Sequence, residues 1–307
     1  MKRISAMRWR GECNIVVAEG ATKWDIIHPE RDKWNFGPTD KLLEYAQSHG
    51  MKMRGHTLIW YEALPAWAKK ALEDDKSKAE ALMEEHIGAV MSRYKGKFLS
   101  WDVVNEALKP GEAWWLGDQM RDTPWREAMG DSYVEKAFRM AAQADPDAQL
   151  VYNDYQIEAG SVKAKAALKL LRGLKDKNVP IHAVGLQAHM HTGSKLDPLE
   201  NFCKEAKSLG LEVIITELDV FDSARATQEE NDKRVAAKTK EFLDIISSVA
   251  VPKQILTWGL SDRHSWLSNA KWNKSNPTGR RIRGLPLDDN MRRKPMWRAL
   301  HEFLEKA

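Results

Sequence analysis

The sequence predicts an α/β fold, and within that class a (β/α)8 TIM barrel whose first βα unit is short or missing. Apolar, β-branched runs alternate with segments of helical periodicity, the runs start with almost uninterrupted hydrophobic residues, and each ends on polar or aromatic ones. Such runs indicate strands buried on both faces, as in a parallel sheet covered by helices. The 307 residues contain no Pro- or Gly-rich linker and no repeat, so we expect one domain over residues 1–307.

Seven strands are expected to alternate with helices. The strands are residues 14–18, 51–60, 98–107, 148–157, 181–190, 211–220 and 253–262, and the helices are 38–49, 76–95, 133–144, 161–177, 197–208, 228–247 and 295–306. A closed barrel needs an eighth strand, for which residues 1–13 offer only the poor candidate RISAM (3–7). We therefore expect a short strand there, an open barrel, or a gap filled by another chain. Because an open barrel exposes two sheet edges, a homodimer is one hypothesis.

Composition argues against several classes of protein. A net charge of +4, with 43% apolar and 30% charged residues, is ordinary for a soluble protein, and no apolar run is long enough to predict a membrane span. The start lacks an apolar core of signal-peptide length, so we expect an intracellular protein or a secreted one whose leader has been removed. The basic segments 279–284 and 291–298 are interpreted as a solvated loop rather than a nucleic-acid surface. Cys13 and Cys203 predict neither a disulfide framework nor a zinc site.

Polar and aromatic side chains mark the carboxyl end of each expected strand. In a parallel barrel these ends converge on one mouth, where the active sites of this architecture lie. The residues are Glu19, Lys23, His56, Trp60, Asn105, Glu106, Asn153, Asp154, Tyr155, Gln187, His189, Glu217, Asp219 and Trp258.

Two glutamates stand out because each ends a β-branched run: Glu106 in WDVVNEAL (101–108) and Glu217 in VIITELDV (213–220). A structural ion pair or a helix cap would explain one such glutamate, but two make that explanation less favourable, since a buried carboxylate is costly without a partner. Asn105 and Glu106 are adjacent, so both can face the mouth only if the backbone is irregular at 104–106.

Alternation along the strands groups further residues. Glu217 and Asp219 share one face of their strand, as do Gln187 and His189. His191 lies on the same face as His189, but without an opposed carboxylate–histidine set we predict no metal site. The 13 tryptophans suit both a core and stacking on sugar rings; Trp24 and Trp101 are assigned to the core.

Six motifs resemble, in order and spacing, those of glycoside hydrolase family 10, the endo-β-1,4-xylanases. They are GHTLIW (55–60), WDVVNEAL (101–108), YNDY (152–155), GLQAHM (185–190), ITELD (215–219) and TWGLSD (257–262), and the resemblance runs from about residue 14 to 305. It implies a (β/α)8 barrel that hydrolyses xylan or xylo-oligosaccharides with retention of configuration and without a cofactor.

The resemblance also implies roles. Glu106 would be the general acid/base and Glu217 the nucleophile, with carboxyl groups about 5–5.5 Å apart. We expect burial and the charge of Glu217 to raise the pKa of Glu106, and His189, oriented by Asp219, to donate to ionised Glu217. Asn105 would bind the sugar 2-hydroxyl. The substrate-binding set implied is Glu19, Lys23, His56, Trp60 and Gln187, with Tyr155 on the leaving-group side and Trp258 and Trp266 walling the sugar at the cleavage point.

Three positions depart from the family pattern: Gly20, Tyr61 and Ala63 stand where asparagine, histidine and glutamine are usual. Each lost amide removes hydrogen bonds of roughly 0.5–1.5 kcal/mol on the glycone side. The main alternative to a xylanase is therefore a non-catalytic or weakly active sugar-binding barrel. A hydrolase acting on cellulose or aryl glycosides and a metal-dependent barrel enzyme are further alternatives.

Overall fold

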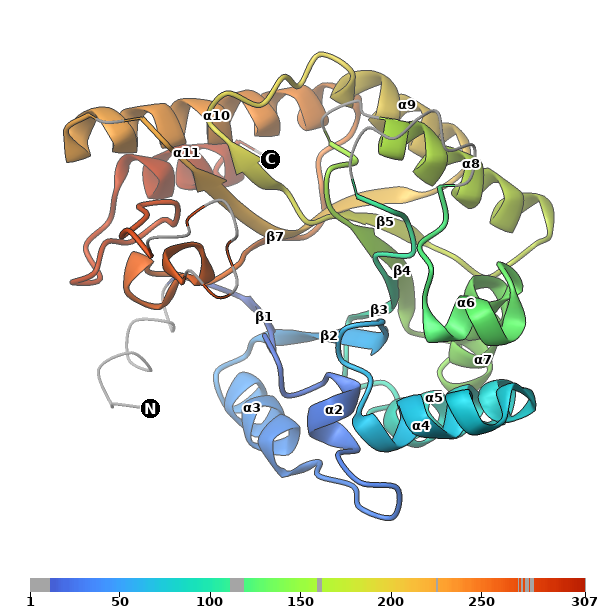
Figure 1. Cartoon of the computed structure of the whole chain (residues 1–307). Helices are drawn as coiled ribbons and strands as arrows, with labels where there is room; N and C mark the ends of the chain where they lie inside the picture. The colour runs from blue at the N-terminus through green and yellow to red at the C-terminus, as the bar shows by residue number, and fades with distance from the viewer. Residues whose placement is uncertain are drawn as a thin grey trace. The chain divides into compact units, whose positions relative to one another are not determined.

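The protein forms two compact units. A computed structural model describes residues 12–110, 119–158, 162–224, 226–269, 271, 273, 276 and 279–306. The first unit comprises Met1–Lys109, Trp114–Asp154 and Lys169–Val184, and the second comprises Pro110–Ala113, Tyr155–Leu168 and Gly185–Ala307. Strands and helices alternate along the chain in both (Figure 1).

The strands of the first unit follow one another in chain order. They are β1 (Ile15–Val17), β2 (Lys52–Ile59), β3 (Ser100–Asn105) and β4 (Gln149–Asp154), which pair in parallel, and β5 (Ala183–Leu186), which comes next and crosses the boundary between the units. Almost every residue of β2, β3 and β4 is buried. Burial on both faces is what their near-continuous hydrophobicity predicts.

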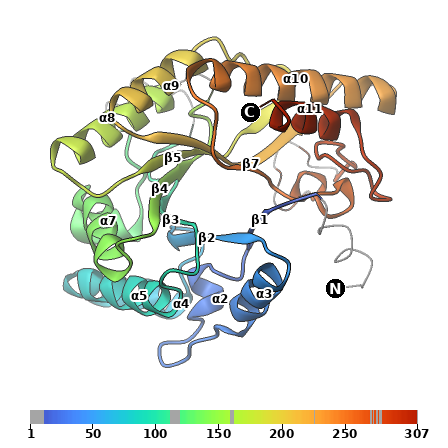
Figure 2. The ribbon, with the colours of Figure 1, turned by 180° about the vertical axis from the view of Figure 1, so that it is seen from behind.

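Helices cover the outer side of these strands (Figures 1 and 2). They are α2 (Trp24–Ile27), α3 (Gly37–Ser48), α4 (Ala66–Asp74), α5 (Ala79–Arg93), α6 (Pro124–Met129), α7 (Ser132–Ala144) and the second half of α8 (Val162–Asp176), with a 3-10 turn, η1 (Lys76–Lys78), before α5. The buried residues of α7 recur every three or four positions, as the packed face of an amphipathic helix requires.

The second unit is built around β7 (Glu212–Phe221), which lies beside β5, β6 (His189–His191) and β8 (Ile255–Thr257). The β6–β7 and β7–β8 pairs are parallel. Its helices are the first half of α8, α9 (Leu199–Ser208), α10 (Gln228–Val249) and α11 (Pro295–Leu304), with 3-10 turns η3 (Asp262–His264) and η4 (Trp266–Ser268). A capping box between Thr227 and Glu230 starts α10, which packs along α11 (Figures 1 and 2).

All seven expected strand segments contain a strand, and together they account for the eight described strands because the fifth segment is divided. Ala188, with φ of 56°, separates β5 from β6. The alternation that placed Gln187 and His189 on one face therefore cannot be carried across this break. Of the segment proposed to supply a first strand, residues 12 and 13 lie outside any strand, and residues 1–11 lie outside the described residues. One domain over residues 1–307 stays a prediction.

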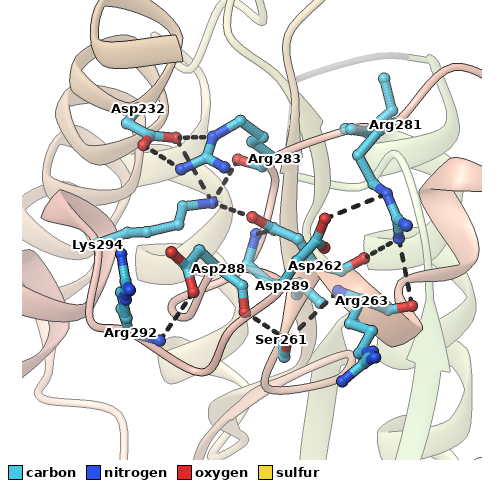
Figure 3. Close-up of polar contacts among 12 residues, drawn as sticks. Asp232, Ser261, Asp262, Arg263, Arg281, Arg283, Asp288, Asp289, Arg292 and Lys294 are labelled. Atoms are coloured by element: carbon cyan, nitrogen blue, oxygen red, sulfur yellow. Dashed lines mark hydrogen bonds and ion pairs between the residues drawn. The ribbon is translucent and has the colours of Figure 1, made fainter.

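A network of charged side chains ties the segment after β8 to α10 within the second unit (Figure 3). Asp232 of α10 accepts hydrogen bonds from Arg283 at 2.9 and 2.7 Å, and Lys294 Nζ donates to Asp262 at 2.8 Å. Burial raises the pKa of Asp262 to about 6 against the pull of Lys294, and burial lowers the pKa of Lys294. The prediction of a solvated loop is therefore wrong for Arg283 and Lys294, whose charges are paired within the fold. Among the described helices, none is long and apolar enough to cross a bilayer.

Close contact between β2 and β3 depends on a glycine in the first unit. Gly55 pairs in register with Trp101, and a Cβ atom at Gly55 would lie 1.9 Å from Trp101 Cε3. Trp101 is fully buried and Trp24 is 2% exposed, so the assignment of both to the core is confirmed. Only glycine leaves room for the indole against the strand.

We expect Gly55→Ala to lower the free energy of unfolding by roughly 3 kcal/mol or more, because neither the buried indole nor the strand backbone can yield without strain. Gly88→Ala in α5 is the control. Apart from its chain neighbours and the backbone of its own helix, no atom lies within 4 Å of the added Cβ, so Gly88→Ala should stabilise the protein by about 0.5–1 kcal/mol. Urea unfolding measures both, and an unchanged midpoint for Gly55→Ala would contradict the packing described.

Candidate active site

Glu106 lies immediately beyond β3 in the first unit and has a left-handed backbone, with φ of 58°. For a residue with a side chain this conformation costs roughly 1–2 kcal/mol and has to be held by its surroundings. The Glu106 N–H donates to the Asn153 carbonyl at 2.9 Å, and the side chain accepts a hydrogen bond from Asn105 Nδ2 at 3.0 Å. The expected irregularity at 104–106 is confirmed, and it lets adjacent Asn105 and Glu106 make this contact.

His56 is oriented by a buried aspartate opposite it on the neighbouring strand. His56 Nδ1 lies 3.0 Å from Asp102 Oδ2, and Arg54 donates to Asp102 Oδ1 at 2.6 Å. The His56 backbone is also bonded to the Thr22 hydroxyl. Asp102 thus accepts a hydrogen bond from His56 Nδ1. The Nε2 atom of His56 is the ring atom that can contact other groups.

Two further predicted residues gather near His56. Lys23, which directly precedes α2, places Nζ 4.5 Å from the centroid of the Trp60 ring, and the His56 ring lies 6.4 Å from the same ring. Glu19 follows β1 and is exposed, and no described contact joins it to this group. Five predicted residues therefore lie in the second half of β2, at or just beyond the ends of β2 and β3, or just before α2: Lys23, His56, Trp60, Asn105 and Glu106.

The second unit holds a hydrogen-bonded series that ends on Glu217. His189 Nε2 lies 3.3 Å from Glu217 Oε2, and His189 Nδ1 lies 3.0 Å from Asp219 Oδ1. Trp266 Nε1 donates to the other Asp219 oxygen at 2.6 Å. Glu217 and Asp219 both contact His189, so the prediction that they share one face of β7 is confirmed.

The electrostatic state of His189 follows from these contacts. Burial by itself lowers the pKa of the imidazole, but the adjacent Asp219 and Glu217 outweigh burial and raise the pKa well above 6.5. Both ring nitrogens then carry protons, so His189 donates to Glu217 and to Asp219 together. This favours the ionised form of Glu217.

Four further predicted residues belong to the second unit, and two of them, Trp258 and Trp266, lie beside His189. The rings of Trp258 and Trp266 have centroids 6.5 and 5.0 Å from that of His189, each in an edge-to-face arrangement. Gln187 is buried between β5 and β6. Tyr155 lies just after β4, with Lys163 Nζ 3.4 Å from its ring centroid. Glu106 belongs to the first unit and Glu217 to the second, and the spacing of their carboxyl groups stays a prediction.

Sequence reasoning missed the charged residues that hold these side chains in place. Arg54 and Asp102 are fully buried inside β2 and β3, and Arg121 donates from Nε to the Glu106 carbonyl at 2.9 Å. Arg54 and Asp102 could have been found from the sequence, because each is a charged residue in the middle of an apolar strand. Opposite charges in two adjacent buried strands predict a buried ion pair. Arg121 carries no such signal. Among the described residues, no group of three or more histidine, cysteine, aspartate or glutamate side chains is arranged to hold a metal ion.

Comparison with known proteins identifies the family of this chain. The sequence profile of glycosyl hydrolase family 10 matches residues 4–303. The chain belongs to this family. A β-1,4-xylanase of Dictyoglomus thermophilum is 36% identical over 264 residues, covering 83% of this chain and 73% of the relative. Endo-1,4-beta-xylanase B of Thermotoga neapolitana is 32% identical over 296 residues, covering 96% and 82%.

Solved structures of the family agree with the fold. Native xylanase 10B from Thermotoga maritima is 36% identical, with a TM-score of 0.88 over 98% of this chain and 89% of that one. Xylanase 10B from Thermotoga petrophila in complex with xylobiose is 35% identical, with a TM-score of 0.88 over 98% and 88%. The family 10 chain is therefore a glycoside hydrolase with the α/β, (β/α)8 TIM-barrel fold class that the sequence predicts.

We expect Asp219→Asn to lower the pKa of His189, because the substitution removes the largest charge that opposes burial of the imidazolium. NMR titration of the His189 ring measures the change, with Asp244→Asn at an exposed position of α10 as the control.

The same shift links His189 to stability. A raised pKa contributes stability that is fully present below about pH 6.5 and is lost as the pH rises through the folded-state value. Unfolding followed across this alkaline range should therefore show a smaller loss in Asp219→Asn than in the wild type. A His189 titration unchanged by Asp219→Asn would contradict the arrangement described.

Proposed function

We propose that the protein is a retaining endo-1,4-β-xylanase, with Glu106 as general acid/base and Glu217 as nucleophile. The observation that carries the proposal is the series from Trp266 through Asp219 and His189 to Glu217, which stabilises a carboxylate inside the buried strand β7. The family supports it, since the relatives compared are named xylanases. Xylan or a xylo-oligosaccharide is the proposed substrate, and the T. petrophila relative is described in complex with xylobiose.

The reaction proceeds in two displacements. In the first, a Glu217 carboxylate oxygen bonds the anomeric carbon, the glycosidic C–O bond breaks, and Glu106 gives its proton to the departing oxygen. In the second, ionised Glu106 takes a proton from water, the water oxygen bonds the anomeric carbon, and Glu217 leaves as a carboxylate. Retention follows from the two inversions.

Supporting roles follow from the contacts within each unit. Protonated His189 holds Glu217 ionised in the free enzyme, and Asp219 keeps the imidazole oriented. Asn105 is bonded to Glu106 and to Asn153, so its amide is fixed for a sugar 2-hydroxyl. Glu19, Lys23, His56, Trp60 and Gln187 are proposed to bind the glycone, Tyr155 the leaving group, and Trp258 and Trp266 the sugar at the cleavage point.

A weakly active sugar-binding protein is the second candidate, and the departures from the family pattern favour it. Ala63 is 6% exposed, so a buried methyl group stands where an amide is usual, and Gly20 presents no side chain at all. These changes weaken glycone binding but leave the two glutamates in place. Dimerisation through an incomplete barrel stays a prediction.

Hydrolysis of xylan with Glu106→Ala and Glu217→Ala tests the proposal. We expect the wild type to release reducing ends with the β-anomer formed first by NMR, and to discriminate against glucan, whose extra hydroxymethyl group has to be accommodated. Glu106→Ala should lower kcat by roughly 10²–10⁴-fold, and Glu217→Ala should abolish turnover while calorimetry still detects xylo-oligosaccharide binding.

Glu302→Ala, at an exposed position of α11, controls for the loss of a carboxylate and should behave as the wild type. An α-anomer formed first would contradict the retaining mechanism. Full activity in Glu217→Ala would contradict its assignment. Binding without hydrolysis by the wild type would establish the second candidate instead.

A further inference from the structure

The carbonyl of Glu106 is held by a side chain from another part of the first unit. Arg121 Nε donates to this carbonyl at 2.9 Å, and the Arg121 backbone N–H donates to the Ala107 carbonyl at 2.8 Å. Arg121 therefore bonds two consecutive peptides at the point where the chain leaves β3. This is the point at which Glu106 has its left-handed conformation.

Arg121 is in turn held by an aromatic ring. Its guanidinium carbon lies 4.4 Å from the ring centroid of Tyr61, which is within the range of a cation–π contact. The Tyr61 ring meets Trp60 edge-on, with centroids 6.0 Å apart, and its hydroxyl donates to Glu62 at 3.0 Å. A continuous series of contacts thus runs from Tyr61 through Arg121 to the Glu106 peptide.

Electrostatics link the same three residues. Burial, and after it the charge of Glu106, raises the pKa of the Tyr61 phenol, whereas Arg121 opposes the rise. Tyr61 therefore lies within the electrostatic reach of both Glu106 and Arg121. The three groups thus lie close together, as the hydrogen bond from Arg121 to the Glu106 carbonyl also requires.

We propose that Tyr61 and Arg121 are positioning residues for Glu106: Arg121, stacked on the Tyr61 ring, bonds the Glu106 peptide and keeps its carboxyl group in the orientation needed for proton transfer. The inference rests on the proposed function, in which Glu106 is the general acid/base. It assigns a task to Tyr61, which stands where the family pattern has histidine. The ring face is the part of Tyr61 that acts, and the hydroxyl is secondary.

The test compares kcat/KM for two substrates that differ in their need for an acid. Xylotetraose releases a poor leaving group that Glu106 has to protonate, whereas 2,4-dinitrophenyl β-xylobioside releases a phenolate that needs no proton. We expect Tyr61→Leu to lower kcat/KM for xylotetraose roughly 10- to 100-fold, and that for the aryl glycoside by no more than about threefold. Tyr61→Phe, which keeps the ring face, should restore most of the loss.

Arg121 variants provide a second readout. The alkaline limb of the pH profile of kcat/KM reports the proton on the acid of the free enzyme. Arg121→Met removes a cation near Glu106, so this limb should move to higher pH. Arg121→Lys keeps the charge but loses the Nε–H donor that bonds the Glu106 carbonyl. The alkaline limb of the pH profile should therefore stay in place while kcat/KM for xylotetraose falls.

Phe36→Leu is the matched control. The guanidinium carbon of Arg93 lies 4.6 Å from the centroid of the Phe36 ring, which is a similar cation–π contact elsewhere in the same unit. It should leave the ratio of the two kcat/KM values unchanged. Equal losses on both substrates in Tyr61→Leu and Arg121→Lys, or no loss on either, would overturn the inference. If Tyr61→Leu does not fold, the Arg121 variants decide by the same comparison.

Glu106→Ala separates failure of the inference from failure of the proposed function. If Glu106→Ala lowers kcat/KM equally for both substrates, the assignment of Glu106 as acid/base is wrong, and the inference is wrong with it. If Glu106→Ala loses more kcat/KM on xylotetraose than on the aryl glycoside but the Tyr61 and Arg121 variants do not, only the inference is wrong.

Discussion

The charge on Glu217 is supported by the imidazole of His189, whose Nε2 atom lies 3.3 Å from Glu217 Oε2. Glu217 is buried inside β7, and burial disfavours the ionised form of a carboxylate. His189 stays protonated there because Glu217 faces one of its nitrogens and Asp219, the stronger influence on its pKa, faces the other at 3.0 Å. Each carboxylate therefore stabilises the imidazolium, and removing the imidazole would leave Glu217 and Asp219 without the cation that lies between them.

The first unit uses the same arrangement of histidine and aspartate for a different purpose. In both units a buried aspartate lies 3.0 Å from the Nδ1 atom of a histidine in a neighbouring strand, Asp102 beside His56 and Asp219 beside His189. The difference lies in what else the aspartate contacts. Arg54 neutralises Asp102, whereas Asp219 has the neutral indole of Trp266. The charge of Asp219 is therefore available to stabilise an imidazolium, and that of Asp102 is already paired.

Much of the fold could be predicted because its signals are local. The β-branched runs marked every described strand, and the adjacency of Asn105 and Glu106 required the backbone irregularity found at Glu106. The division of the fifth strand segment could not be foreseen, since alanine at a left-handed position gives no sequence signal. Lys294 was misjudged for a related reason: the carboxylate that pairs with it, Asp262, lies 32 residues away.

The candidate site divides in the same way. Its reactive groups are polar residues at the ends of apolar runs, which one sequence reveals. The groups that hold them, such as Arg121 and Asp102, come from other parts of the chain or from strand interiors, where only packing brings the partners together. Polar residues at strand ends thus indicate what the site does, and the side chains behind them determine how well it does so.

Trapping the covalent intermediate tests the account most directly. A 2,4-dinitrophenyl 2-deoxy-2-fluoro-β-xylobioside carries a fluorine that slows both displacements and a leaving group that lets only the first proceed at a useful rate. After proteolysis, mass spectrometry should find one fluoroxylobiosyl unit per chain, attached to Glu217. Attachment to any other residue, or continued turnover without a trapped ester, would contradict the assignment of Glu217 as the nucleophile.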